Sequence, residues 1–177
     1  MSEKGFRRNN FFSGRILTAA DLDLEQTYFR EKQRLHNREL HGFGIVSGLE
    51  VSRRRDKLII TAGLALDCEG NEIVVAETQS HPLPQLNLDT SVFLIIYYRQ
   101  TKTNPTPVPS ADNSSEPALI QESFSLAFEN SSPDQSHRHK GGRRQSCGKP
   151  HGLVLARLRK TSGQWQLDRR LRRADVK

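Results

Sequence analysis

The apolar residues near the start of the chain recur at helical spacing. Leu24, Tyr28 and Leu35 fall on one face of a helix, while charged side chains occupy most of the positions between them. A helix of this kind buries one stripe and leaves its other faces to solvent or to a partner. The pattern predicts a single long helix from about Ala19 to Leu40.

Both ends of this helix carry recognisable signals. Thr18 is followed three residues later by Asp21, so a hydroxyl can accept a bond from a free amide and a carboxylate can meet the positive helix end. At the other end, Gly42 is typical of a residue that stops a helix.

After Gly42 the apolar residues alternate, as expected for half-buried strands. The predicted fold class is α+β: one long N-terminal helix followed by a mainly antiparallel β domain of about seven or eight short strands with two long polar loops. The apolar runs that predict strands are 45–46, 49–51, 58–61, 64–66, 73–75, 92–98, 124–128, 153–158 and 165–167.

Two polar stretches interrupt the strands. One is rich in Thr, Asn, Pro and Ser, and the other in His, Arg, Gly and Ser; long loops of this kind are usually functional or disordered. The predicted organisation is an N-terminal arm over 1–17, the helix over 18–41 and a β domain over 42–177, with mobile excursions at 101–117 and 131–152.

Composition limits the size of the core and suggests a compartment. Of the 177 residues, 34% are hydrophobic and 27% are charged, so part of the chain is expected to lie outside a compact core. Two cysteines, Cys68 and Cys147, are too few for a disulfide scaffold, and the chain has no apolar leader or long apolar run. These features predict a cytoplasmic protein without a transmembrane segment.

The net charge of +7 is unevenly distributed. From residue 131 onward, thirteen Lys and Arg face three Asp and Glu, whereas the preceding residues are slightly acidic. Such a basic segment is either solvated or available to an acidic protein surface, an anionic lipid or nucleic acid.

One loop gathers potential metal ligands. His137, His139, Cys147 and His151 lie within fifteen residues, and imidazole and thiolate are common zinc ligands. Their spacing matches no usual structural zinc pattern, so a small zinc-binding protein is an alternative and not the main interpretation.

Arginines near the C-terminus leave a second alternative. Arg169, Arg170, Arg172 and Arg173 could contact phosphates in a basic nucleic-acid-binding module. Aromatic residues do not alternate with these charges as a stacking surface requires, so nucleic acid is not expected as the main partner.

Other patterns do not point to catalysis. Gly42, Gly44 and Gly48 follow a helix without the spacing of a dinucleotide loop, and are interpreted as a helix end and strand kinks. His36 and His41 are five positions apart, which places them on different faces of an α-helix and predicts no pair. We expect no enzyme activity, no cofactor and no small-molecule substrate.

The segment from Asn10 to Val75 resembles a family of small structural proteins, associated with the baseplate or cap, of phage tail-like contractile injection systems. The matching features are an aromatic-x-Gly-Arg-x-Leu-Thr opening, charged helical steps and glycine-punctuated hairpins. They lie at Phe12–Thr18, Asp21, Glu25–Tyr28, Arg34–Arg38, His41–Val51, Gly63–Asp67 and Gly70–Val75. Residues 153–158 and 164–168 fit the closing hairpin of the family more loosely.

The resemblance implies a non-catalytic particle subunit. Its implied partners are baseplate, sheath or cap proteins in a symmetric assembly, first of all at the baseplate periphery and second at the cap end. The particle would be cytoplasmic at first, and then either membrane-attached or released.

The predicted docking surface is the helix together with the hairpin that follows it. Its candidate residues are aromatic side chains that could anchor a partner, cations beside them and glycines that permit close backbone approach. They are Phe11, Phe12, Arg15, Tyr28, Phe29, Arg34, Arg38, Gly42, Gly44 and Gly48. For Tyr28, the alternative is a place in the domain's own core.

Overall fold

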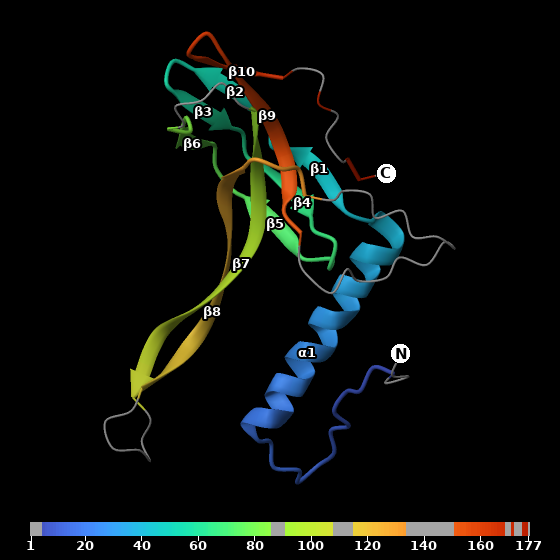
Figure 1. The fold of residues 1–177 in the computed structure, drawn as a ribbon. Helices are drawn as coiled ribbons and strands as arrows, with labels where there is room; N and C mark the ends of the chain where they lie inside the picture. Colours follow the sequence, from blue (N-terminus) through green and yellow to red (C-terminus); the bar gives the residue numbers. More distant parts are fainter. Residues whose placement is uncertain are drawn as a thin grey trace.

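The computed structural model describes residues 5–85, 91–107, 115–133, 151–168, 171, 175 and 176. Its fold class is α+β with mostly antiparallel strands, as predicted. A helical segment, made of α1 (Ala19–His36) and the π-helical turn η1 (Asn37–His41), precedes all of the strands. Figure 1 shows the strands gathered into a body from which this helix projects.

The strands form three sheets in the part of the chain that the structure describes. The first sheet has the order β1-β4-β5, with β1 (Gly44–Gly48), β4 (Gly63–Leu66) and β5 (Glu72–Val75). The second has the order β2-β3-β6, with β2 (Val51–Arg54), β3 (Lys57–Ile60) and β6 (Gln79–Pro82). The third has the order β10-β9-β7-β8, with β7 (Ser91–Pro107), β8 (Ser115–Glu129), β9 (Leu153–Thr161) and β10 (Gln164–Leu167).

These ten described strands exceed the seven or eight predicted. One reason is the bend after β1: Gly48 and Leu49 both adopt positive φ, which ends β1 and directs the chain into β2 of another sheet. Another is β6, whose sequence Gln-Ser-His-Pro has low strand propensity. Backbone pairing with β3, in which Leu58 faces His81, makes it a strand.

The hydrophobic core lies between the sheets and excludes the helix. It includes Leu49 and Leu58 near the second sheet, Ile73 of the first, and Leu94 and Leu158 of the third, all fully buried. None of the residues of α1, which the structure describes throughout, is buried. The body is therefore a β structure stabilised by its own apolar contacts, and α1 contributes little to that stability.

The long hairpin of β7 and β8, called here the β7–β8 ribbon, projects from the same body (Figure 1). β9 pairs with β7 only over Ser91–Ile96, whereas β8 pairs with it as far as Pro107. The outer half of the ribbon is thus two-stranded among the described residues. Isolated two-stranded ribbons have marginal stability in water, so this half gains from any neighbour.

The polar stretch predicted as a loop over 101–117 differs from the structure at both of its ends. Thr101–Pro107 continues β7, and the chain from Ser115 onward belongs to β8. The low strand propensity of these residues is overcome by the ladder itself, in which Thr103 faces Leu119 and Thr106 faces Glu116. Of the second stretch, 131–152, only 131–133 and 151–152 belong to the described residues.

Candidate functional site

A capping box begins α1, as the Thr18–Asp21 spacing predicts. The Thr18 hydroxyl oxygen accepts from the Asp21 amide at 3.3 Å, and the Thr18 amide donates to the Asp21 carboxylate at 3.0 Å. Arg15 pairs with the same carboxylate. Hydrogen bonds from the backbone and the side chain of Thr18 lower the pKa of Asp21, with a further contribution from Arg15. Arg15 therefore fixes the arm against the helix start.

The N-terminal arm also contacts the side of α1. The Phe6 ring meets Tyr28 edge to face at 6.3 Å between centroids, and Tyr28 meets Phe29 at 5.3 Å. The Lys32 ammonium lies 5.6 Å from the centroid of the Phe6 ring. These contacts half-bury Tyr28 on the helix surface. Tyr28 is not part of the β core, which was the alternative location considered from the sequence.

Exposed apolar side chains concentrate on the arm and the helical segment. Twelve large apolar side chains are exposed among the described residues, and eight of them lie between Phe6 and Leu40. Phe11 is 55% exposed, Phe12 65% and Phe29 61%. Leu22 and Phe29 are seven residues apart, so they lie on one face of α1. Large apolar areas that stay exposed are typical of interaction sites.

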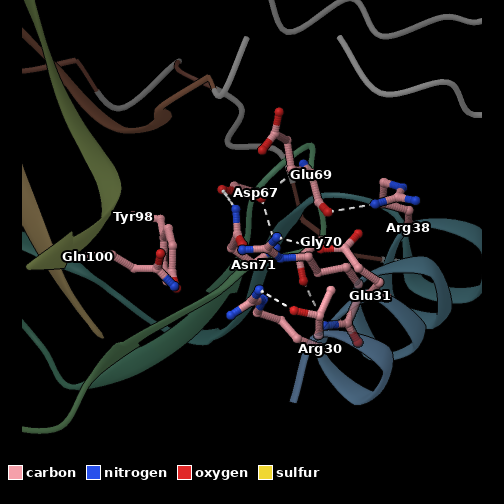
Figure 2. A network of polar contacts seen from close by, with 12 residues as sticks. Arg30, Glu31, Arg38, Asp67, Glu69, Gly70, Asn71, Tyr98 and Gln100 are labelled. Atoms are coloured by element: carbon pink, nitrogen blue, oxygen red, sulfur yellow. Dashed lines mark hydrogen bonds and ion pairs between the residues drawn. The ribbon is translucent and has the colours of Figure 1, made fainter. Parts of the chain in front are cut away.

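The junction of the helix with the body is polar and depends on a turn between β4 and β5. Asn37 is buried, and its Nδ2 donates to the main-chain oxygen of Gly70 at 2.9 Å. Arg38 donates to the main-chain oxygen of Glu69 at 2.8 Å, a bond drawn in Figure 2. Gly70 has φ +84, and a Cβ added there would overlap the carbonyl oxygen of Arg34. The helix can approach this turn only because residue 70 is a glycine.

The turn itself is held by Asp67. This buried carboxylate accepts from the amides of Glu69 and Asn71, each at 2.9 Å, and from the Asn71 side chain at 2.7 Å. The turn-forming residues are recognisable in the sequence. Their contact with Asn37 is not, because it joins residues that are more than thirty positions apart.

The interface candidates other than the exposed aromatics are engaged within the chain. Arg34 pairs with Glu31 at 3.0 Å, and Arg38 is half-buried at the junction. A Cβ on Gly48 would overlap the backbone of Ala62, so this glycine serves the passage between strands. Gly42 has φ +82 at the end of η1, and Gly44 is buried in β1.

A cleft separates α1 from the β7–β8 ribbon, and its root is a cavity of about 150 Å³. Figure 2 shows Arg30 of the helix on one side and Tyr98 and Gln100 of β7 on the other, with Asn71 between them. The Tyr98 hydroxyl donates to Glu122 at 2.7 Å. Burial, followed by this bond to Glu122, raises the pKa of Tyr98 to about 12. The hydroxyl therefore keeps its proton at a higher pH than an ordinary tyrosine does.

The histidine prediction was wrong in one respect. The rings of His36 and His41 lie 5.2 Å apart, because the π-helical turn η1 aligns residues five positions apart. The described residues contain no group of three or more His, Cys, Asp or Glu that could hold a metal ion. Of the four predicted zinc ligands, His151 is described and half-buried, whereas His137, His139 and Cys147 lie outside the described residues, as do the four C-terminal arginines. No helix among the described elements is long and apolar enough to cross a bilayer.

Comparisons with known proteins give a fold relationship. No protein-family model and no curated protein sequence matches the chain. A solved structure of the type VI secretion system baseplate complex is similar over 96% of this chain and 60% of its own chain, with 13% identity and a TM-score of 0.57. A structure of the TssK-TssF-TssG baseplate subcomplex is similar over 96% of this chain and 62% of its own, with 13% identity and a TM-score of 0.56. A crystal structure of TssK is similar over 93% of this chain and 43% of its own, with 14% identity and a TM-score of 0.54. The chain thus spans less than two thirds of each of these neighbours, and it shares its fold with type VI baseplate proteins.

Proposed function

We propose that this protein is a structural, non-enzymatic subunit of the baseplate of a contractile injection particle. The arm and α1 form its docking surface toward other baseplate subunits. The proposed position is the baseplate periphery, and the cap end is the second choice. The fold similarity to type VI baseplate proteins supports the particle assignment. The sequence resemblance over Asn10–Val75 supports the same assignment independently.

The observation that carries the docking surface is a helix without a buried residue that displays apolar side chains. In proteins, most of the stability of a helix comes from packing of its apolar face, and α1 buries no residue within this chain. Phe11, Phe12, Leu22 and Phe29 offer apolar area that the body does not cover. Buried aromatic anchors dominate many protein interfaces, which makes these side chains the proposed contacts.

Two experiments test the proposal. The first is mass spectrometry of sedimented, nuclease-treated and salt-washed particles from the native host. We expect this chain at a fixed ratio to the sheath protein, and a ratio far below one would favour a position at one end. Its absence from particles rich in sheath and tube would refute the assignment.

The second experiment replaces the proposed anchors. The double variant Phe11→Ala, Phe12→Ala should fold normally, because neither ring touches the core, yet enter particles poorly. Val74→Ala is the matched control, since it removes a similarly exposed apolar side chain, 58% exposed, from β5. Equal incorporation of both variants would exclude the arm as the docking surface.

The two alternatives from the sequence remain predictions. Salt-sensitive binding to DNA would favour the nucleic-acid module. One zinc ion per purified chain would favour a metal site at His137, His139, Cys147 and His151.

A further inference from the structure

The cavity at the root of the cleft between α1 and the ribbon is lined by arginines on the helix side and by a tyrosine and a glutamate on the ribbon side. α1 contributes Arg30 and Arg34, and the ribbon contributes Tyr98 and Glu122. Glu72 of β5 lies at the base. The cavity of about 150 Å³ is several times the roughly 30 Å³ that one water molecule occupies in the liquid.

The carboxylates of this cavity already have donors. Glu72 accepts from Gln33 and from Asn37, each at 3.2 Å. Glu122 accepts from the Tyr98 hydroxyl at 2.7 Å and from Gln100 at 3.4 Å. In each carboxylate, Oε1 thus accepts from two donors that are not arginines.

Arg30, in contrast, is short of acceptors. Its Nη2 donates to the Thr27 hydroxyl at 3.2 Å, and its Nε is buried without a hydrogen-bond partner among the described residues. Arg34, one helical turn away, is paired with Glu31, whereas no described carboxylate pairs with Arg30. Buried donors without partners are rare and costly in folded proteins, which makes Arg30 a candidate to bind a further acceptor.

We propose that the root of this cleft binds the carboxylate of an Asp or Glu side chain that a neighbouring protein subunit inserts between α1 and the ribbon, with Arg30 as the main donor. The inference rests on the proposed function, because it names the chemistry of the partner at the same helix. Phe29 is the residue next to Arg30 and is exposed, so the ion-pair site adjoins the proposed apolar surface.

The geometry favours a carboxylate of a protein over a phosphate. A guanidinium group matches a planar carboxylate with two parallel hydrogen bonds, and the resulting bonds are short and strong. Glu72 and Glu122 line the same cavity, so a dianionic phosphate would meet more repulsion than a single carboxylate. A cavity of about 150 Å³ has room for one side chain, whereas a polymer backbone needs a longer groove.

The main test compares variants of Arg30 in binding to baseplates assembled without this chain. Arg30→Gln keeps the length and polarity of the side chain but removes the charge, and should weaken binding about tenfold to a hundredfold. Arg30→Lys keeps the charge without the planar fork and should lie between wild type and Arg30→Gln. Arg54→Gln, on the exposed turn end of β2, is the control and should bind like wild type.

A photo-reactive amino acid at position 100, across the cleft from Arg30, should then cross-link to a partner segment that contains Asp or Glu. Alanine in place of that acid should weaken binding by the same factor as Arg30→Gln, and the two changes together should add little. Normal binding of Arg30→Gln, with weak binding of Phe11→Ala, Phe12→Ala, would overturn this inference and leave the docking surface in place.

A measurement on the isolated chain separates the inference from the particle assignment. The NMR resonance of the Arg30 Nε–H should shift when glutarate is added, and shift less with inorganic phosphate at equal ionic strength. No shift with glutarate, or a larger shift with phosphate, would contradict a carboxylate site.

Discussion

Asn37 donates from Nδ2 to the main-chain oxygen of Gly70 at 2.9 Å, and this pair joins the helical arm to the strand body. Asn37 is the only buried residue of the helical segment Ala19–His41, all of which is described. Since α1 has no place in the apolar core, its direction depends on a few polar bonds around Asn37.

We expect Asn37→Ala to loosen the helix without unfolding the body. The change leaves the buried oxygen of Gly70 without this donor, which typically costs about 1–3 kcal/mol. Hydrogen exchange of the amides in the last turns of α1 should accelerate, while exchange in β7 and β9 should not. Gln26→Ala, at an exposed position of the same helix, is the control. Unchanged exchange in α1 would show that Asn37 does not hold the junction.

A pair of glycine substitutions separates backbone strain from close packing. Gly70 and Gly163 both have positive φ, at +84 and +77, so an alanine at either site costs about 1–2 kcal/mol in conformation. Only at Gly70 does the new Cβ meet other atoms, those of Arg34. Urea denaturation should therefore show a greater loss of stability for Gly70→Ala than for Gly163→Ala. Equal losses of stability would mean that the helix can move away from the new Cβ at residue 70 without a cost in folding free energy.

The ribbon tyrosines should titrate late. Tyr97 and Tyr98 each have a pKa raised to about 12, by burial first and then by hydrogen bonds to Glu129 and Glu122. Between pH 10 and 12 the folded state keeps protons that the unfolded state has lost, so stability should fall as pH rises through this window. Glu122→Gln should lower the pKa of Tyr98 toward 10 while Tyr97 stays high, as followed by tyrosinate absorbance. A titration midpoint near 10 for both residues in the wild type would contradict this account.

The helix start should fray when its cap is removed. Thr18→Ala eliminates the hydroxyl that accepts from the Asp21 amide and should cost about 1 kcal/mol. The pKa of Asp21 is lowered in the folded state. The stability that the ionised Asp21 contributes should therefore be complete above pH 3.8, the ordinary pKa, and be lost as the pH falls through the lower pKa of the folded state. Circular dichroism of Thr18→Ala should show less helix than Ser13→Ala, which alters an exposed residue of the arm. Equal helix content would mean that the arm and Arg15 hold this end alone.

The features that sequence predicts well here are local. The capping box at Thr18 and Asp21 and the helix end at Gly42 each depend on residues within a few positions of one another. Side-chain hydrogen bonds and backbone preferences of single residues determine them, so the pattern of residues is sufficient.

The features that sequence misses depend on distant partners. Thr101–Pro107 has the composition of a loop, yet becomes a strand because residues 115–121 are aligned with it. Gln79–Pro82 is a strand only because β3 offers a free edge. The cleft donor Arg30 could not be distinguished from a solvated arginine, since the sequence shows neither the burial of its Nε nor the cavity that it lines together with residues of the ribbon.

The π-helical turn between α1 and β1 fixes the rotation of the helix about its own axis. In η1 the Gly42 amide bonds to the Asn37 oxygen at 2.8 Å, a closure of five residues where an α-helix closes four. Loss of one residue from Asn37–His41 would rotate α1 by about 100° relative to β1, or pull Asn37 away from Gly70. The direction in which Phe29 and Arg30 face is therefore determined by chain length, and single-residue insertions and deletions in η1 should be tolerated less well than substitutions there.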